Sequence, residues 1–179
     1  MAAVSLTIPI GKEDHVQGPA QAPVTLLEYG DYECAYCGAA YPMVKAITKR
    51  LGPKLRFAFR NMPLNEMHPN AELAAEAAEA AAAQGKFWEM HDALYEHQSE
   101  LGPNLVRTLV RQLQLDTQRF EDDLAARRFR EHVRHDFMSG VRSGVAGTPT
   151  FFINGERYDG DLDERSLTAA LHNAIEQRA

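Results

Sequence analysis

The feature that most constrains this chain is a pair of cysteines, Cys34 and Cys37, which are the only two in its 179 residues. An apolar run from Val24 to Leu27 precedes the pair and a helical pattern follows it, which predicts that Cys34 lies at the N-terminus of a helix. Unpaired N–H groups and the helix dipole stabilise an anion there, and the thiolate is the reactive form of cysteine. The pair therefore indicates a dithiol/disulfide redox centre.

Composition narrows the function further. A net charge of −6 gives no support for binding nucleic acid or an anionic membrane, and no apolar run approaches the roughly 20 residues of a membrane helix. The stretch from Met1 to Ile10 is a poor secretory signal, so we expect a cytoplasmic protein. Structural disulfides are rare there, which makes a lone Cys-x-x-Cys catalytic or metal-binding.

The first third of the chain predicts a β-α-β unit with parallel strands. Strands are expected at 24–29 and 55–60, joined by a helix that ends at Leu51. Ahead of this unit, Leu6 to Ile10 is expected to form an edge strand and Gly11 to Pro23 a loop.

The middle of the chain predicts only helices, and the end returns to sheet. The expected helices span 69–84, 86–97, 105–115, 116–126 and 129–141. A strand at 147–153 then turns through Asn154-Gly155, a strong hairpin signal, and Asp163 is expected to cap a final amphipathic helix.

This order of elements resembles the thioredoxin fold, and its helical insertion is similar to that of the DsbA-like family of thiol–disulfide oxidoreductases. The stretches that carry the resemblance are Glu28-Tyr29-Gly30-Asp31-Tyr32-Glu33-Cys34-Ala35-Tyr36-Cys37, His68-Pro69 with its alanine-rich helix, Lys86 to His91, and Gly147-Thr148-Pro149-Thr150-Phe151-Phe152-Ile153-Asn154-Gly155. The resemblance implies an α/β thioredoxin-like fold, with a central mixed sheet flanked by helices and an inserted all-helical subdomain. We expect one domain over 1–179, with thioredoxin-like parts at about 14–62 and 145–179 and the insertion at about 66–143.

The resemblance also implies roles for the two cysteines. Cys34 would be the attacking thiolate and the exposed sulfur of the disulfide, and Cys37 would resolve the mixed disulfide formed with a substrate. Without the resemblance, the pair could be a structural disulfide or half of a zinc site. A zinc site would have to recruit histidine or carboxylate ligands from elsewhere, because the chain has no further cysteine.

Three more residues take their roles from the same resemblance. Pro149 would have a cis peptide bond beside the cysteines, and Thr148 would offer its backbone to an extended substrate segment. Glu28 would be a buried acid that relays a proton to or from Cys37. The plain alternatives are an ordinary turn proline at 149 and a solvent-facing glutamate at 28.

The dipeptide between the cysteines departs from the best-known members. Ala35-Tyr36 supplies neither proline nor histidine, and Asp31 and Glu33 are close in sequence. We therefore expect weak stabilisation of the Cys34 thiolate and a protein that is not a strong oxidant, unless the pKa of Cys34 lies below about 5. Tyr36 is expected to offer substrates an apolar contact.

The seven histidines predict no metal site. His132 and His135 are three apart on one expected helix, but no second Cys-x-x-Cys or His-Glu-x-x-His motif accompanies them. His91 is expected to pack in the core beside Phe87 and Trp88, and the other histidines are expected at the surface.

The sequence thus predicts a DsbA-like oxidoreductase that exchanges disulfides with protein or small-molecule thiols, in the reducing or exchange direction. It needs no bound cofactor, although glutathione is a candidate co-substrate, and a redox recycling partner is required. Two alternatives stay open: a glutathione-coupled enzyme acting on small molecules, and a metal-binding or chaperone-like module that uses Cys34 and Cys37 as ligands. The substrate, the partner and the oligomeric state do not follow from the sequence.

Overall fold

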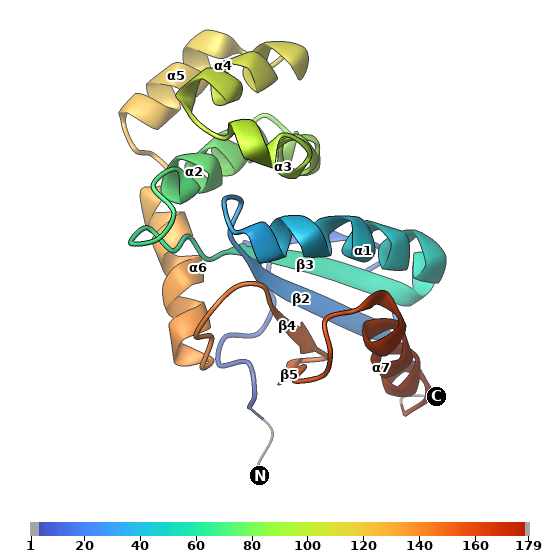
Figure 1. Ribbon diagram of the computed structural model, residues 1–179. Coiled ribbons are helices and arrows are strands. Elements are labelled where there is room, and N and C mark those ends of the chain that lie inside the picture. The colour runs from blue at the N-terminus through green and yellow to red at the C-terminus, as the bar shows by residue number, and fades with distance from the viewer. Residues whose placement is uncertain (1–3, 178–179) are drawn as a thin grey trace.

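The computed structural model describes residues 4–177 and has a mixed five-stranded sheet at its centre (Figure 1). The strand order is β1-β3-β2-β4-β5. Only β2 and β3 are parallel, and the other neighbours are antiparallel. The strands are β1 (His15–Gln17), β2 (Val24–Gly30), β3 (Leu55–Asn61), β4 (Thr150–Ile153) and β5 (Glu156–Arg157).

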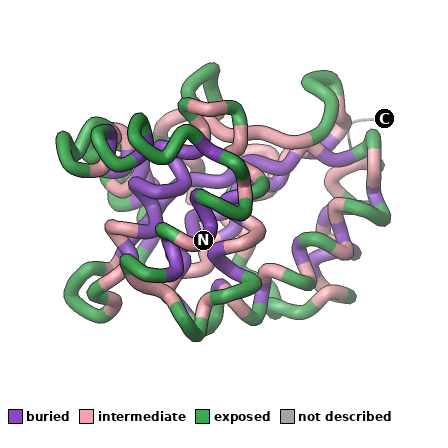
Figure 2. The backbone as a smooth tube through the Cα atoms, turned by 90° about the horizontal axis from the view of Figure 1, so that it is seen from above, coloured by how far each residue is buried: buried purple, intermediate pink, exposed green. Residues whose placement is uncertain are grey.

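The two central strands are buried on both faces, which explains their near-continuous apolar sequence. On one face, Leu26 and its neighbours pack with helices α1 (Ala35–Leu51) and α7 (Glu164–Glu176). On the other face, Leu27 belongs to a smaller cluster that is packed against Phe137 of helix α6 (Arg130–Arg142). Figure 2 shows buried residues running through the interior and exposed residues on outer turns and loops.

The helical insertion is made of α2 to α6 and joins the two parts of the sheet (Figure 1). Besides α6, it contains α2 (Ala71–Ala82), α3 (Phe87–Glu96), α4 (Pro103–Gln112) and α5 (Thr117–Ala125). Short 3₁₀ turns lie at Gly52–Lys54 and Gln98–Glu100. Most alanines of α2 are fully buried, because small side chains let α3 and α5 approach its backbone closely. None of the described helices is long and apolar enough to cross a membrane.

The expected edge strand at Leu6–Ile10 is wrong, and so is the loop that was expected to include residues 15–17. Ser5, just before this segment, makes an isolated bridge to Glu156, and the Leu6 N–H donates to the Gly155 carbonyl oxygen at 2.7 Å. The strand that pairs with β3 at the sheet edge is β1. The reason is Arg60, whose guanidinium donates to the carbonyl oxygens of Ile8 and Pro9. These two carbonyl groups therefore accept hydrogen bonds from a side chain and not from a neighbouring strand.

The other expected elements form within a few residues of their predicted ends. Asp163 caps α7 by accepting a hydrogen bond from the Ser166 N–H at 2.9 Å. Asn154 and Gly155 have φ angles of 51° and 87°, as a tight hairpin turn requires. The mixed sheet and the inserted helices confirm the predicted fold class.

Candidate redox site

The fold places Cys34 at the N-cap of α1, directly beyond the end of β2. A side chain from the helical insertion fixes this turn, because Gln98 donates to the carbonyl oxygens of Tyr32 and Cys34 at 2.8 and 2.9 Å. A Cβ atom at Gly38 would lie 2.1 Å from the Gln98 Oε1 atom. Only glycine therefore lets Gln98 approach the first turn of the helix.

The two cysteines have opposite environments. Cys34 is 5% exposed and Cys37 is fully buried, so Cys34 is the sulfur nearer to solvent. The hydrogen bond from the Cys37 thiol, helped by Thr148 and by the N–H groups of Tyr36 and Cys37, outweighs burial and lowers the pKa of Cys34 to about 5. Burial raises the pKa of Cys37 far above its ordinary value. At neutral pH the pair is thus one thiolate and one thiol.

The Cys34 thiolate is stabilised more than its sequence neighbours predict, and the causes of its low pKa do not include Asp31 or Glu33. These two acids bind other groups. The Asp31 carboxylate accepts hydrogen bonds from the N–H groups of Glu33 and Leu64, both at 2.8 Å. It also lies 2.8 Å from Nδ1 of His68. Glu33 binds the backbone and side-chain nitrogens of Asn70 at 2.6 and 2.9 Å. Both carboxylates thus fasten the segment after β3 to the turn before Cys34.

His68 is the functional candidate that sequence reasoning missed. Burial lowers its pKa, but the bond to Asp31 and the negative charges of Asp31 and Cys34 raise the pKa above its ordinary value overall. An imidazole with a raised pKa thus lies within the electrostatic reach of Cys34, supplied from another segment and not from the dipeptide between the cysteines. The His68-Pro69 stretch was visible in the sequence, yet nothing local linked it to Cys34.

Glu28 lies in the middle of β2, opposite Phe59 of β3 and Phe151 of β4. It is 2% exposed, so the solvent-facing alternative is wrong. Burial, followed by the negative charge of Cys34, raises the pKa of Glu28 to about 8. Its Oε1 atom has no hydrogen-bond partner among residues 4–177. The charge of Glu28 in turn raises the pKa of Cys37, so the two groups sense each other.

The Thr148–Pro149 peptide bond is cis and lies beside the redox turn. The neutral Cys34 thiol is within hydrogen-bond distance, 3.4 Å, of the Thr148 carbonyl oxygen. A cleft of about 410 Å³ runs along this segment, lined by residues that include Thr148, Pro149, Tyr158 and Leu162. Tyr36 is 76% exposed. The substrate contacts expected of Thr148, Pro149 and Tyr36 stay predictions.

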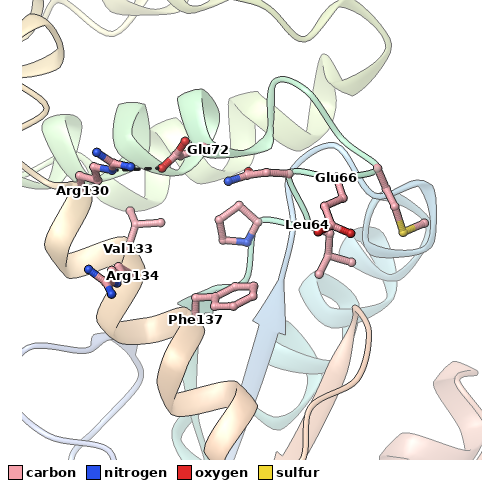
Figure 3. Close-up of a pocket in the computed structure, with 10 residues that line it drawn as sticks. Leu64, Glu66, Glu72, Arg130, Val133, Arg134 and Phe137 are labelled. Atoms are coloured by element: carbon pink, nitrogen blue, oxygen red, sulfur yellow. Dashed lines mark ion pairs between the residues drawn. The ribbon is translucent and has the colours of Figure 1, made fainter.

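A second pocket of about 460 Å³ lies between α6 and the segment after β3 (Figure 3). Phe137 and Val133 of α6 line it opposite Leu64, and Arg130 pairs with Glu72 at its rim. None of the predicted site residues lines this pocket. Thr148 and Pro149 line the smaller cleft, which is therefore the candidate site.

A family model described as thioredoxin matches residues 11–173. The chain belongs to the thioredoxin family. Among curated proteins, this family member is 45% identical over 173 residues to "Na(+)/H(+) antiporter NhaA 1" of Salinispora arenicola and 40% identical over 158 residues to "Na(+)/H(+) antiporter NhaA" of Herminiimonas arsenicoxydans. These matches cover 96% and 88% of this chain but only 26% and 25% of those proteins. The chain thus spans about a quarter of the length of these curated relatives.

Several solved structures have a fold similar to that of this chain. Oxidised BdbD from Bacillus subtilis has a TM-score of 0.86 and 24% identity, covering 97% of this chain and 98% of that one. A thioredoxin-like oxidoreductase from Silicibacter pomeroyi has a TM-score of 0.79 and 26% identity, and the match covers 93% of this chain and 92% of that one. α-DsbA1 from Wolbachia pipientis has a TM-score of 0.83 and 17% identity, and the match covers 97% of this chain and 96% of that one. The family model and these structures show a thioredoxin-family chain that has the fold of BdbD and α-DsbA1 and that contains a Cys-x-x-Cys motif.

Proposed function

We propose that this chain exchanges disulfides with protein or small-molecule thiols through Cys34 and Cys37, in the reducing or exchange direction. The observation that carries the proposal is the opposite pKa shift of the two cysteines, down to about 5 for Cys34 and upward for Cys37. It makes one sulfur a nucleophile at neutral pH and keeps the other as its protonated partner.

In the reducing direction, the Cys34 thiolate attacks one sulfur of a substrate disulfide. A mixed disulfide forms, and the first substrate thiolate leaves and takes a proton from water. Cys37 then loses its proton and attacks the Cys34 sulfur, which releases the second substrate thiolate. The second substrate thiolate also takes a proton from water, two electrons have passed to the substrate, and Cys34 and Cys37 end as a disulfide.

Glu28 is the proposed acceptor of the Cys37 proton. While Cys34 is a thiolate, the pKa of Glu28 is about 8 and the carboxyl group is mostly protonated at neutral pH. The mixed disulfide removes the charge of Cys34, which is the second cause of that raised pKa. The pKa of Glu28 therefore falls, so a larger fraction of this carboxyl group is ionised and able to accept the Cys37 proton at that step.

The cleft beside Pro149 supports an extended peptide as the substrate segment. It runs along the residues that lead into β4, and the carbonyl oxygen of Thr148, one of its lining residues, lies 3.4 Å from the Cys34 sulfur. A strand-like segment there could pair with the Thr148 backbone, while the exposed Tyr36 ring offers an apolar contact. This favours protein thiols over glutathione alone, and glutathione-independent turnover of a protein disulfide would support that choice.

The direction follows from the thiolate and from the compartment. A pKa of about 5 lies between those of about 7 for thioredoxin and about 3.5 for DsbA. We propose a cytoplasmic location, where the glutathione poise of about −220 to −320 mV would keep the pair mostly reduced if its own potential is less negative than that poise. The antiporter relatives are about four times as long, and we propose no transport function for this chain.

The deciding experiment is the equilibrium reduction potential of the Cys34–Cys37 pair in glutathione buffers. We expect a value between about −200 and −270 mV, in the range of the glutaredoxins and thioredoxin. A value near −120 mV would reverse the proposed direction. Failure to form any disulfide would remove the redox proposal altogether.

A further inference from the structure

A cluster of side chains that can bind a metal ion lies where the edge of the sheet meets the helical insertion. It joins His15 of β1, Glu79 of α2 and His132 of α6. The Nε2 atom of His15 is 2.9 Å from Oε2 of Glu79, and Nε2 of His132 is 3.7 Å from Oε1 of the same carboxylate. All three donor atoms lie within 4.8 Å of one another. Neither cysteine belongs to this group.

The spacing of these atoms suits a tetrahedral metal ion. Bonds of about 2.0–2.1 Å to nitrogen and oxygen place neighbouring tetrahedral ligands about 3.3–3.4 Å apart. The measured separations of 2.9 and 3.7 Å lie on either side of that value, so small side-chain rotations bring the donors to one centre. Asp136, one turn after His132 on α6, places its Oδ2 3.8 Å from the His132 Nε2 and offers a fourth ligand.

The surrounding residues hold these ligands in place. The Asn61 side chain donates to Oε1 of Glu79 at 2.7 Å and to Oδ2 of Asp136 at 3.3 Å. The His15 ring stacks on Phe87 with centroids 3.5 Å apart and planes at 11°. Asn61 is 1% exposed, so this amide is held inside the protein beside both carboxylates. Such outer contacts are typical of metal ligands.

The local charge also favours a cation. Glu79 and Asp136 are both 4% exposed. Two buried carboxylates thus lie beside these imidazoles, and a divalent ion would offset their negative charge. The His15 and His132 side chains are 18% and 25% exposed, which leaves a path for the ion.

We propose that His15, Glu79 and His132 bind one zinc ion, with Asp136 or a water molecule as the fourth ligand. Two imidazoles and one carboxylate suit zinc, whereas calcium and magnesium prefer oxygen ligands alone. The ion would connect β1 at the sheet edge to two helices of the insertion. Its role is structural, because its ligands come from three distant segments and none of them contacts the redox cysteines.

Isothermal titration with zinc chloride tests this site in a Cys34→Ser/Cys37→Ser variant, so that the thiols do not bind the metal. We expect about one zinc ion per chain and a higher unfolding temperature with zinc. His132→Ala should weaken zinc binding at least 100-fold, whereas His135→Ala, an exposed neighbour on α6, should leave it unchanged. These readouts are independent of redox activity.

Two further results would overturn the proposal. One is a zinc affinity that is the same in the His132→Ala variant and its parent. The other is calcium binding at this cluster without zinc binding, which would contradict the assignment from imidazole ligands. His15→Ala provides a second test from another element, in case His132→Ala unfolds the protein.

Discussion

At the scale of single residues, the two sulfurs differ because of burial and hydrogen bonding and not because of their neighbours in sequence. The Cys37 thiol is fully buried, and its hydrogen bond is the largest contribution to the low pKa of Cys34. Asp31 and Glu33 are close to Cys34 in sequence, but their carboxylates accept hydrogen bonds from the segment after β3. The expectation of a weakly stabilised thiolate, which was based on the sequence neighbours of Cys34, is therefore wrong.

Cys37→Ala should raise the pKa of Cys34 by about one to two pH units, because a hydrogen bond to a charged group contributes about 1.5–3 kcal/mol. The measurement is the alkylation rate of Cys34 against pH, whose midpoint is expected near 5 in the unmodified reduced protein. Cys37→Ser restores a donor and should move the midpoint back toward 5. An unchanged midpoint in Cys37→Ala would exclude the Cys37 thiol as the main cause.

At the scale of elements, the helical insertion supports the start of α1. Gln98 lies in the 3₁₀ turn after α3 and binds the carbonyl oxygens of Tyr32 and Cys34. The insertion therefore helps to define the turn that orients the attacking sulfur. This contact had no local signal, because 64 residues separate Gln98 from Cys34.

Gln98→Ala should lower the free energy of unfolding by about 1–3 kcal/mol, since it leaves two carbonyl groups of the redox turn without this donor. Urea unfolding of the reduced protein measures the change. Gln112→Ala, at an exposed position of α4, is the matched control and should change stability little. Equal stability of the two variants would mean that water replaces the Gln98 amide without cost.

At the scale of the whole molecule, the buried Glu28 links global stability to pH. Its pKa is raised from 4.5 to about 8 in the folded protein. Between these values the unfolded chain ionises Glu28 while the folded chain keeps it protonated. The folded state thus binds more protons, and this contribution to stability is fully present below pH 4.5 and is lost as pH rises toward 8.

Glu28→Gln should remove this dependence. Between pH 5 and pH 8, the free energy of unfolding of the reduced protein should fall more steeply than that of Glu28→Gln, by up to about 1.4 kcal/mol per pH unit. Urea unfolding at several pH values gives both slopes. Glu66→Gln, at an exposed position, should keep the slope of the unmodified protein. Parallel slopes for the protein and Glu28→Gln would contradict a buried, protonated Glu28.

The sequence by itself determined the fold class, the order of the elements and the place of Cys34 at a helix start. These follow from local periodicity, caps and turn residues, such as Asp163 and Asn154-Gly155, which act within a few positions. Tertiary structure alone decided what is close in space: His68 on Asp31, Gln98 on the redox turn, Arg60 on the segment before β1, and His15 with Glu79 and His132. Electrostatic and metal-binding properties depend on such distances, and no periodicity in the sequence encodes them.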